Sequence, residues 1–178
     1  VQTCALPICV LFAFLYTTGP YPLSYNGWGD ILVIVFFGFV PVGGTYYVQA
    51  LTWTTDTTIA SLICGLLIDT LLVVNNYRDR EADARSGKRT VIVRFGEKFG
   101  SYLYLMLGVT ASLLCFWFLF EGHLYAALLP LLYLIPHFLT WKRMVRIHSG
   151  KKLNSILGET SRNMLLMGVL LSIGFFLN

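Results

Sequence analysis

Long apolar runs alternate with short polar stretches along the whole chain. Each run is long enough, or nearly so, to cross a hydrocarbon core of about 30 Å. Backbone groups at that depth must bond within the chain, so the runs are expected to be helices. The sequence therefore predicts an all-α fold, a polytopic transmembrane helical bundle of about six spans that forms a single domain over residues 1–178. The six runs are residues 4 to 18, 30 to 50, 58 to 77, 99 to 120, 123 to 141 and 160 to 177.

Positive charges are confined almost entirely to two connections between these runs. Of the 13 lysines and arginines, seven lie from Arg78 to Lys98 and five from Lys142 to Lys152. Because loops rich in lysine and arginine stay on the cytoplasmic side, both connections are predicted to be cytoplasmic. The second is expected to meet anionic lipid headgroups. The expected surrounding is the lipid bilayer of the inner or plasma membrane.

The composition agrees with a membrane protein. Hydrophobic residues make up 56% of the chain and charged residues 12%, and the mean hydropathy is +0.69. The net charge of +4 follows from topology, and no groove of basic and aromatic residues indicates a nucleic-acid partner. The four cysteines lie in apolar surroundings without C-x-x-C spacing, which is typical of packing residues and not of a metal site or a disulfide.

The third run continues directly into a densely charged stretch, residues 74–90. If its helix continues, Asp79 and Asp83 lie one turn apart and present two carboxylates that can share a hard cation. Asn75 and Asn76 lie one turn earlier, where an amide can bind a ligand oxygen or a metal. The interleaved cations are Arg78, Arg80, Arg85, Lys88 and Arg89. This mixture favours a Mg²⁺-bound phosphate or diphosphate, and the alternative is a solvated cytoplasmic loop.

A carboxylate also lies within the membrane part of the third run. Asp69 shares a helical face with Asn76 and Asp83, at intervals of seven residues, and is about 15 Å deeper than Asp79 by helical rise. A charge at this depth costs at least a few kcal/mol unless it is paired, protonated or facing water. Asp69 is therefore either a hydrogen-bonded or protonated packing residue, or a residue that lines the cavity.

A second informative stretch, residues 16–30, follows the first run. It is rich in Gly, Pro and aromatic residues, so it cannot continue a helix. Alternation of the spans places it on the same membrane face as the charged stretch. On its own chemistry, it is typical of an aromatic belt at the membrane interface.

Two ordered patterns in these stretches carry a resemblance to a known family. The pattern N-N-x-R-D-x-x-x-D-x-x-x-G-K-x-T over residues 75–90 resembles the second aspartate-rich motif of the UbiA-type intramembrane prenyltransferases, most closely those acting on 1,4-dihydroxy-2-naphthoate in menaquinone synthesis. The pattern Y-T-x-G-P-x-P-L-x-Y-x-G-x-G-D over residues 16–30 is similar to a connection in the same enzymes. The likeness covers nearly the whole chain from Tyr16 onward.

The resemblance implies a transferase that moves a polyprenyl group from its diphosphate to 1,4-dihydroxy-2-naphthoate, with loss of diphosphate and CO₂, to give a demethylmenaquinol. It implies Mg²⁺ as cofactor, and polyprenyl diphosphate and the aromatic acceptor as ligands. Residues 90–94 form a T-x-x-V-R pattern that is similar to one in the family. Its Arg94 either approaches the diphosphate or reaches lipid headgroups. The charged stretch, the resemblance and the position of Asp69 together predict Asp79, Asp83 and Asn75 as catalytic, Asp79 and Asp83 as metal ligands, Lys88, Arg78, Arg94 and Asn76 as diphosphate-binding, and Tyr16, Tyr25 and Asp69 as lining the substrate cavity.

One departure from the family concerns length. Its members have about nine helices and two aspartate-rich motifs, and the first motif has no counterpart in this sequence. The chain is therefore expected to be a C-terminal fragment of a nine-helix UbiA-type fold, without the first three helices and half of the metal site. Such a fragment is expected to be inactive on its own.

Three other functions remain open. A CDP-alcohol phosphatidyltransferase also has an aspartate motif in the membrane, but Asp79-Arg80 does not supply the D-G-x-x-A-R opening that its motif needs. Another UbiA-type branch, acting on 4-hydroxybenzoate, haem or a chlorophyllide, would keep the chemistry and change the acceptor. A transporter or a non-catalytic membrane protein would not depend on the Asp79 carboxylate. Prenyl chain length and oligomeric state are not predicted.

Overall fold

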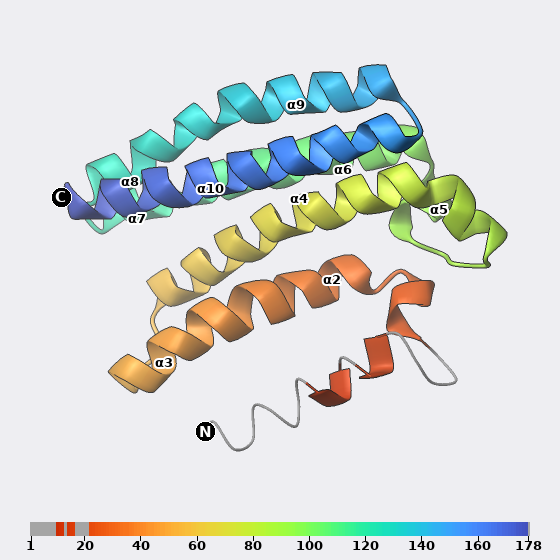
Figure 1. The fold of residues 1–178 in the computed structure, drawn as a ribbon. Coiled ribbons are helices and arrows are strands. Elements are labelled where there is room, and N and C mark those ends of the chain that lie inside the picture. The colour runs from red at the N-terminus through yellow and green to blue at the C-terminus, as the bar shows by residue number, and fades with distance from the viewer. Residues whose placement is uncertain (1–9, 13, 17–21, 178) are drawn as a thin grey trace.

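The computed structural model describes residues 10–12, 14–16 and 22–177, and that part of the chain forms helices without any strand (Figure 1). The predicted all-α class is therefore confirmed. The elements are η1 (Leu23–Asn26), α2 (Gly29–Val33), the π-helical η2 (Ile34–Gly43), α3 (Gly44–Ala50), α4 (Thr55–Arg85), α5 (Val91–Phe95), α6 (Glu97–Leu114), α7 (Trp117–Phe120), α8 (Leu124–Leu128), η3 (Leu129–Tyr133), α9 (Leu134–Ile147), η4 (Lys151–Leu153) and α10 (Asn154–Phe176).

Within the described residues, four helical stretches are long and apolar enough to cross a membrane. They are Gly29–Ala50, Thr55–Arg85, Glu97–Phe120 and Leu124–Ile147, and they match the second to fifth predicted runs. The first predicted run lies largely outside the described residues. α10 covers the sixth run, but it is not among the four, because its first half carries polar residues that include Glu159 and Arg162. Of the six or so spans expected, four therefore meet this criterion within the described residues.

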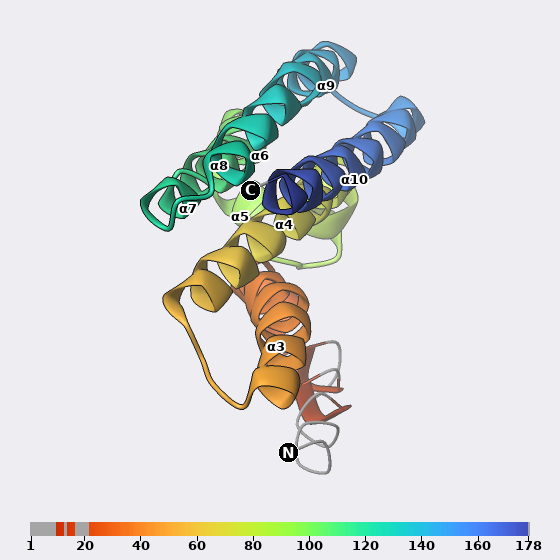
Figure 2. The ribbon, with the colours of Figure 1, turned by 90° about the vertical axis from the view of Figure 1, so that its left-hand side faces the viewer.

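α4 runs through the middle of the bundle (Figures 1 and 2). The continuous helix formed by α2, η2 and α3 packs along one side of it, and α6 and α10 pack against it from the other. α9 lies on the outside, against α6 and α10. The connection after α4 and the connection between α9 and α10 lie at one end of the bundle, and the C-terminus lies at the opposite end.

Glu97 ties the two basic connections together at their shared end. Its carboxylate accepts hydrogen bonds from Tyr77 Oη at 2.8 Å and from Arg80 Nη2 at 3.1 Å. It also pairs with Nδ1 of His148, which belongs to the second basic connection. Both connections therefore share one face, as the distribution of lysine and arginine requires.

The two ends of α4 follow from local chemistry. Thr54 Oγ1 accepts a hydrogen bond from the N–H of Thr57, which satisfies one of the donors that a helix start leaves unpaired. Beyond the other end, Gly87 adopts a φ of +77°, which costs glycine little and a residue with Cβ more. The helix spans 31 residues, or about 46 Å, which exceeds a hydrocarbon core. Its last turns, with Asp83, therefore extend beyond the apolar layer.

Glycines let η2 and α4 approach closely. A Cβ on Gly38 would lie 2.4 Å from the carbonyl oxygen of Ser61 and 2.9 Å from the Cα of Gly65. A Cβ on Gly65 would lie 2.8 Å from the carbonyl oxygen of Ile34. Pro41, which has no N–H to donate, lies within the π-helical stretch. This close contact fixes the first described span against α4 and so positions the connection that precedes it.

We expect Gly38→Ala to destabilise the bundle. The added methyl group would overlap backbone atoms of α4, and overpacking of this kind typically costs about 1–3 kcal/mol. Gly44→Ala is the matched control in the same span, because a Cβ there would have no neighbour within 4 Å and alanine favours the helix. Thermal unfolding in detergent should give a lower midpoint for Gly38→Ala and an equal or higher one for Gly44→Ala. Equal midpoints for the two variants would contradict the close contact.

Candidate functional site

A cavity of about 450 Å³ lies where the end of α4 meets residues 22–30 and 86–90. Six of the residues predicted for the site line it: Tyr16, Tyr25, Asn75, Asn76, Asp83 and Lys88. No site role was predicted for the other residues that line it, which are Ser24, Gly27, Gly29, Asp30, Leu72, Ser86 and Thr90. The two stretches that carried the resemblance therefore form one cavity.

α4 presents its contribution from a single face. Leu72, Asn76 and Asp83 are separated by four and seven residues, so they follow each other along that face. Asn76 is 4% exposed, which places its amide within the bundle at the side of the cavity. The predicted continuation of the third run as a helix is what brings these side chains into line.

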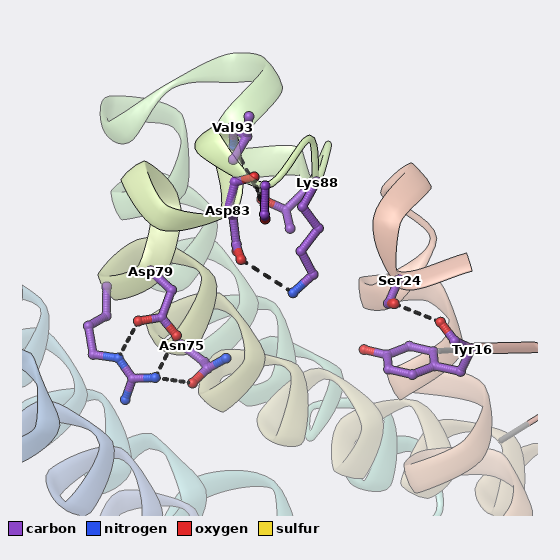
Figure 3. A network of polar contacts seen from close by, with 10 residues as sticks. Tyr16, Ser24, Asn75, Asp79, Asp83, Lys88 and Val93 are labelled. Carbon is purple, nitrogen blue, oxygen red and sulfur yellow. Dashed lines mark hydrogen bonds and ion pairs between the residues drawn. The ribbon is translucent and has the colours of Figure 1, made fainter. Parts of the chain in front are cut away.

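Asp83 and Lys88 form the polar end of the cavity (Figure 3). The Nζ atom of Lys88 lies 3.5 Å from Oδ1 of Asp83 and 6.0 Å from the ring centre of Tyr25. The other carboxylate oxygen, Oδ2 of Asp83, is buried and has no hydrogen-bond partner among the described residues. This end therefore offers a cation for an anionic ligand and an unused carboxylate oxygen for a metal ion or a donor.

Asp79 contacts Arg78 and not the Lys88 that pairs with Asp83 (Figure 3). Arg78 Nε lies 2.7 Å from Oδ1 of Asp79, and Arg78 Nη2 lies 2.6 Å from its Oδ2. The same guanidinium donates to the side-chain oxygens of Asn75 at 2.7 Å and Asn154 at 2.9 Å. Neither Asp79 nor Arg78 lines the cavity. Two predictions would require the bidentate contact between Arg78 and Asp79 to open. They are joint metal binding by Asp79 and Asp83, and diphosphate binding by Arg78, and both stay predictions.

The connection of residues 22–30 is held against the segment after α4. The backbone N–H of Arg89 donates to the carbonyl of Tyr25 at 2.8 Å, and Arg94 Nη2 donates to the carbonyl of Asn26 at 2.9 Å. Gly27 has a φ of +83°, and a Cβ there would lie 3.0 Å from the carbonyl oxygen of Arg89. Arg94 does not line the cavity, so its predicted contact with the diphosphate remains a prediction. Residues 17–21 of the motif lie outside the described residues.

Two more carboxylates lie at the inner end of the cavity. Asp30 lines it, and Asp69 is 1% exposed and lies just below Leu72 on α4. Oδ1 of each is buried without a hydrogen-bond partner among the described residues. Asp69 does not line the cavity, so its predicted lining role also stays a prediction. Asp30 closes the G-x-G-D part of the second motif, and no role was predicted for it from the sequence.

The residues at the polar end fit a magnesium ion bound together with a phosphate group. Within residues 10–12, 14–16 and 22–177, no cluster of three or more His, Cys, Asp or Glu side chains suits a metal ion. Mg²⁺ is commonly held by one or two carboxylates plus substrate phosphates, and the unpartnered Oδ2 of Asp83 is a carboxylate oxygen available for that role. The amide of Asn76 adds a neutral oxygen at the cavity wall, whereas the side-chain oxygen of Asn75 accepts a hydrogen bond from Arg78.

Comparison with known proteins identifies the family. The model of the UbiA prenyltransferase family matches residues 3–176. The chain belongs to the UbiA prenyltransferase family. This membership favours the interpretation as a UbiA-type prenyltransferase over the interpretations as a CDP-alcohol phosphatidyltransferase, a transporter or a non-catalytic membrane protein.

Three similar members of the family are named for one activity, prenyl transfer to 1,4-dihydroxy-2-naphthoate. The 1,4-dihydroxy-2-naphthoate octaprenyltransferases of Haemophilus influenzae and Escherichia coli are each 33% identical to the chain, over 96% of the chain and 56% of their own length. The 1,4-dihydroxy-2-naphthoate octaprenyltransferase of Mycobacterium tuberculosis is 42% identical over 61% of the chain and 37% of its own length. The chain thus spans about half the length of the curated relatives that it matches. No solved structure matches it significantly.

We expect Arg94→Ala to loosen residues 22–30. The substitution removes the hydrogen bond to the Asn26 carbonyl, and a hydrogen bond from a charged group typically contributes about 1.5–3 kcal/mol. Hydrogen–deuterium exchange in nanodiscs should show at least about tenfold faster exchange of amides in residues 22–30. Arg146→Ala, in an exposed part of the second basic connection, should leave these amides unchanged. Identical exchange in both variants would show that Arg94 does not hold this connection.

Proposed function

We propose that the chain is the C-terminal part of a membrane prenyltransferase. The enzyme transfers a polyprenyl group from its diphosphate to 1,4-dihydroxy-2-naphthoate, releasing diphosphate and CO₂ and giving a demethylmenaquinol. The observation that carries this proposal is the cavity built by the two motif-bearing stretches, with Lys88 and an unpartnered Asp83 oxygen at one end. The activity of the relatives supports the choice of acceptor.

The polar end binds the diphosphate in this proposal. Lys88 binds its oxygens, and Asp83 with Asn76 provides oxygens for a divalent cation. Asn75 joins them when Arg78 releases its side-chain oxygen. Mg²⁺, when bound, supplies positive charge that stabilises the leaving diphosphate. The protein's own contribution is to place the Lys88 cation and the amide groups where negative charge develops as the allylic C–O bond breaks. The polyprenyl chain occupies apolar surface between the helices.

The protein groups differ in how they act on the substrates. Tyr16 and Tyr25 line the cavity beside the acceptor and provide aromatic surface for a planar ring. Arg94 acts as a positioning residue, because it holds the connection that contains Tyr25. Arg78 keeps Asp79 neutralised until substrate and metal compete for the pair.

The membrane orientation follows from the same arrangement. The two basic connections lie at one end of the bundle, and the cavity lies at that end, beside the first of them. Loops rich in lysine and arginine are retained on the cytoplasmic side. These observations support the proposal that the cavity faces the cytoplasm of a multi-pass protein in the inner or plasma membrane, where a charged diphosphate reaches it from the aqueous side.

Residues 1–178 alone should show no Mg²⁺-dependent prenyl transfer, because the relatives extend over nearly twice this length. The longest encoded protein that contains the chain should transfer the prenyl group of farnesyl diphosphate to 1,4-dihydroxy-2-naphthoate, and chelation of Mg²⁺ should abolish the transfer. Product formation is measured by chromatography with labelled diphosphate. Transfer by the 178-residue chain would refute the fragment hypothesis. Preference for 4-hydroxybenzoate would refute the proposed acceptor.

We expect Asp83→Asn to weaken Mg²⁺-dependent diphosphate binding at least about tenfold, because a charged ligand to the metal is lost. Glu81→Gln, two residues away and exposed, is the control and should bind normally. The measurement is titration calorimetry of farnesyl diphosphate with and without Mg²⁺, on the longest encoded protein in nanodiscs. Equal affinities for the two variants would remove Asp83 from the proposed site.

A further inference from the structure

The inner end of the cavity differs from its polar end because its two carboxylates have no lysine or arginine partner among the described ion pairs. Oδ1 of Asp30 and Oδ1 of Asp69 are both buried without a hydrogen-bond partner among the described residues. Asp69 is 1% exposed, and the two carboxylates are close enough to interact electrostatically. Tyr16 interacts electrostatically with both, so the three side chains form one cluster.

Gly29 brings the members of this cluster together. A Cβ on Gly29 would lie 3.4 Å from Cδ2 of Leu72 and 3.5 Å from Oη of Tyr16. Asp30 follows directly, and Asp69 lies three residues before Leu72 on α4, which is close to one helical turn. The N-terminus of α2, the Tyr16 hydroxyl and the acidic face of α4 therefore meet at the inner end of the cavity.

Two buried carboxylate oxygens within electrostatic range of each other are unfavourable unless something compensates them. Removing an ionised carboxylate from water without a hydrogen-bond donor costs several kcal/mol, and a second one beside it adds repulsion. The described ion pairs contain neither Asp30 nor Asp69. Protonation of Asp69 removes one of the two charges, and a ligand that presents hydrogen-bond donors and no negative charge at this end would compensate Asp30, which lines the cavity.

We propose that Asp30 accepts a hydrogen bond from a hydroxyl group of the aromatic acceptor, with Asp69 behind it as a positioning residue. This assignment rests on the proposed function and makes Asp30 a determinant of acceptor specificity. It selects aromatic rings that carry hydroxyl groups, because these rings offer O–H donors to the unpartnered oxygen.

The charges along the cavity then orient the acceptor. Lys88 lies at the polar end, and Asp30 and Asp69 lie at the inner end. A carboxylate on the acceptor is repelled by the two acids and attracted by Lys88. The ring therefore enters with a hydroxyl group toward Asp30 and its carboxylate toward the diphosphate end.

The test compares two ligands that differ only in their hydroxyl groups. Binding of 1,4-dihydroxy-2-naphthoate and of 2-naphthoate is measured by titration calorimetry on the longest encoded protein that contains the chain, in nanodiscs. The wild-type protein should prefer the dihydroxy compound. Asp30→Asn should weaken binding of the dihydroxy compound at least about tenfold, leave 2-naphthoate unchanged, and change the affinity for farnesyl diphosphate less than about threefold. Asp69→Asn should also reduce the preference for 1,4-dihydroxy-2-naphthoate over 2-naphthoate.

Asp56→Asn is the matched control on α4. Asp56 lies at the opposite end of the helix, where its Oδ1 accepts a hydrogen bond from Trp117 Nε1 at 2.8 Å, and an amide oxygen can replace that acceptor. This variant should keep the wild-type preference. The inference is overturned if Asp30→Asn keeps the preference, if it weakens both naphthoates equally, or if the wild-type protein shows no preference. If any of these results is found and the wild-type protein still transfers the prenyl group, only the role of Asp30 is refuted and the proposed function stands. If the wild-type protein transfers the prenyl group to no acceptor, the proposed function itself is refuted.

Discussion

The arrangement of the site depends on the uninterrupted backbone hydrogen bonding of α4. The helix continues for 31 residues, so it carries an ordered polar face from the apolar layer to the basic end of the bundle. Asp69, Leu72, Asn76 and Asp83 lie along that face at intervals of three, four and seven residues. A break after the apolar run would leave Asp83 on a loop, and its distance from the inner carboxylates would no longer be determined by helical geometry.

The second constraint is the contact between two connections that are far apart in sequence. Backbone and side-chain donors from Arg89 and Arg94 bind the carbonyls of Tyr25 and Asn26, and Gly27 permits this approach. Carbonyl groups in such a connection have no partners within a regular helix, so they need donors from elsewhere. The same hydrogen bonds hold the part of this connection that lines the cavity, so the Arg94 side chain has a structural role.

Much of this arrangement was predictable from the sequence, because helical periodicity and apolar length are local properties. The all-α class and the α4 span follow from them. The shared face of the two basic connections was predicted from the distribution of lysine and arginine, and the cavity roles of Tyr16 and Tyr25 were implied by the family resemblance. The pairing of Arg78 with Asp79 was not predictable, since adjacent residues on a helix do not face each other and only the long guanidinium makes the contact. The role of Asp30 also depends on a long-range approach, because Gly29 places α2 beside Leu72.

The carboxylates of the site consequently differ in environment although they share one chemical group. Asp79 is neutralised by a bidentate guanidinium, Asp83 has one lysine partner and one unused oxygen, and Asp30 and Asp69 have an unpartnered oxygen each. The charge gradient at the site therefore has two levels: Asp79 and Asp83 have arginine or lysine partners at the basic end, whereas Asp30 and Asp69 have none among the described ion pairs. A ligand with negative charge at one end and hydroxyl donors at the other matches this gradient, and its reverse orientation would place like charges together.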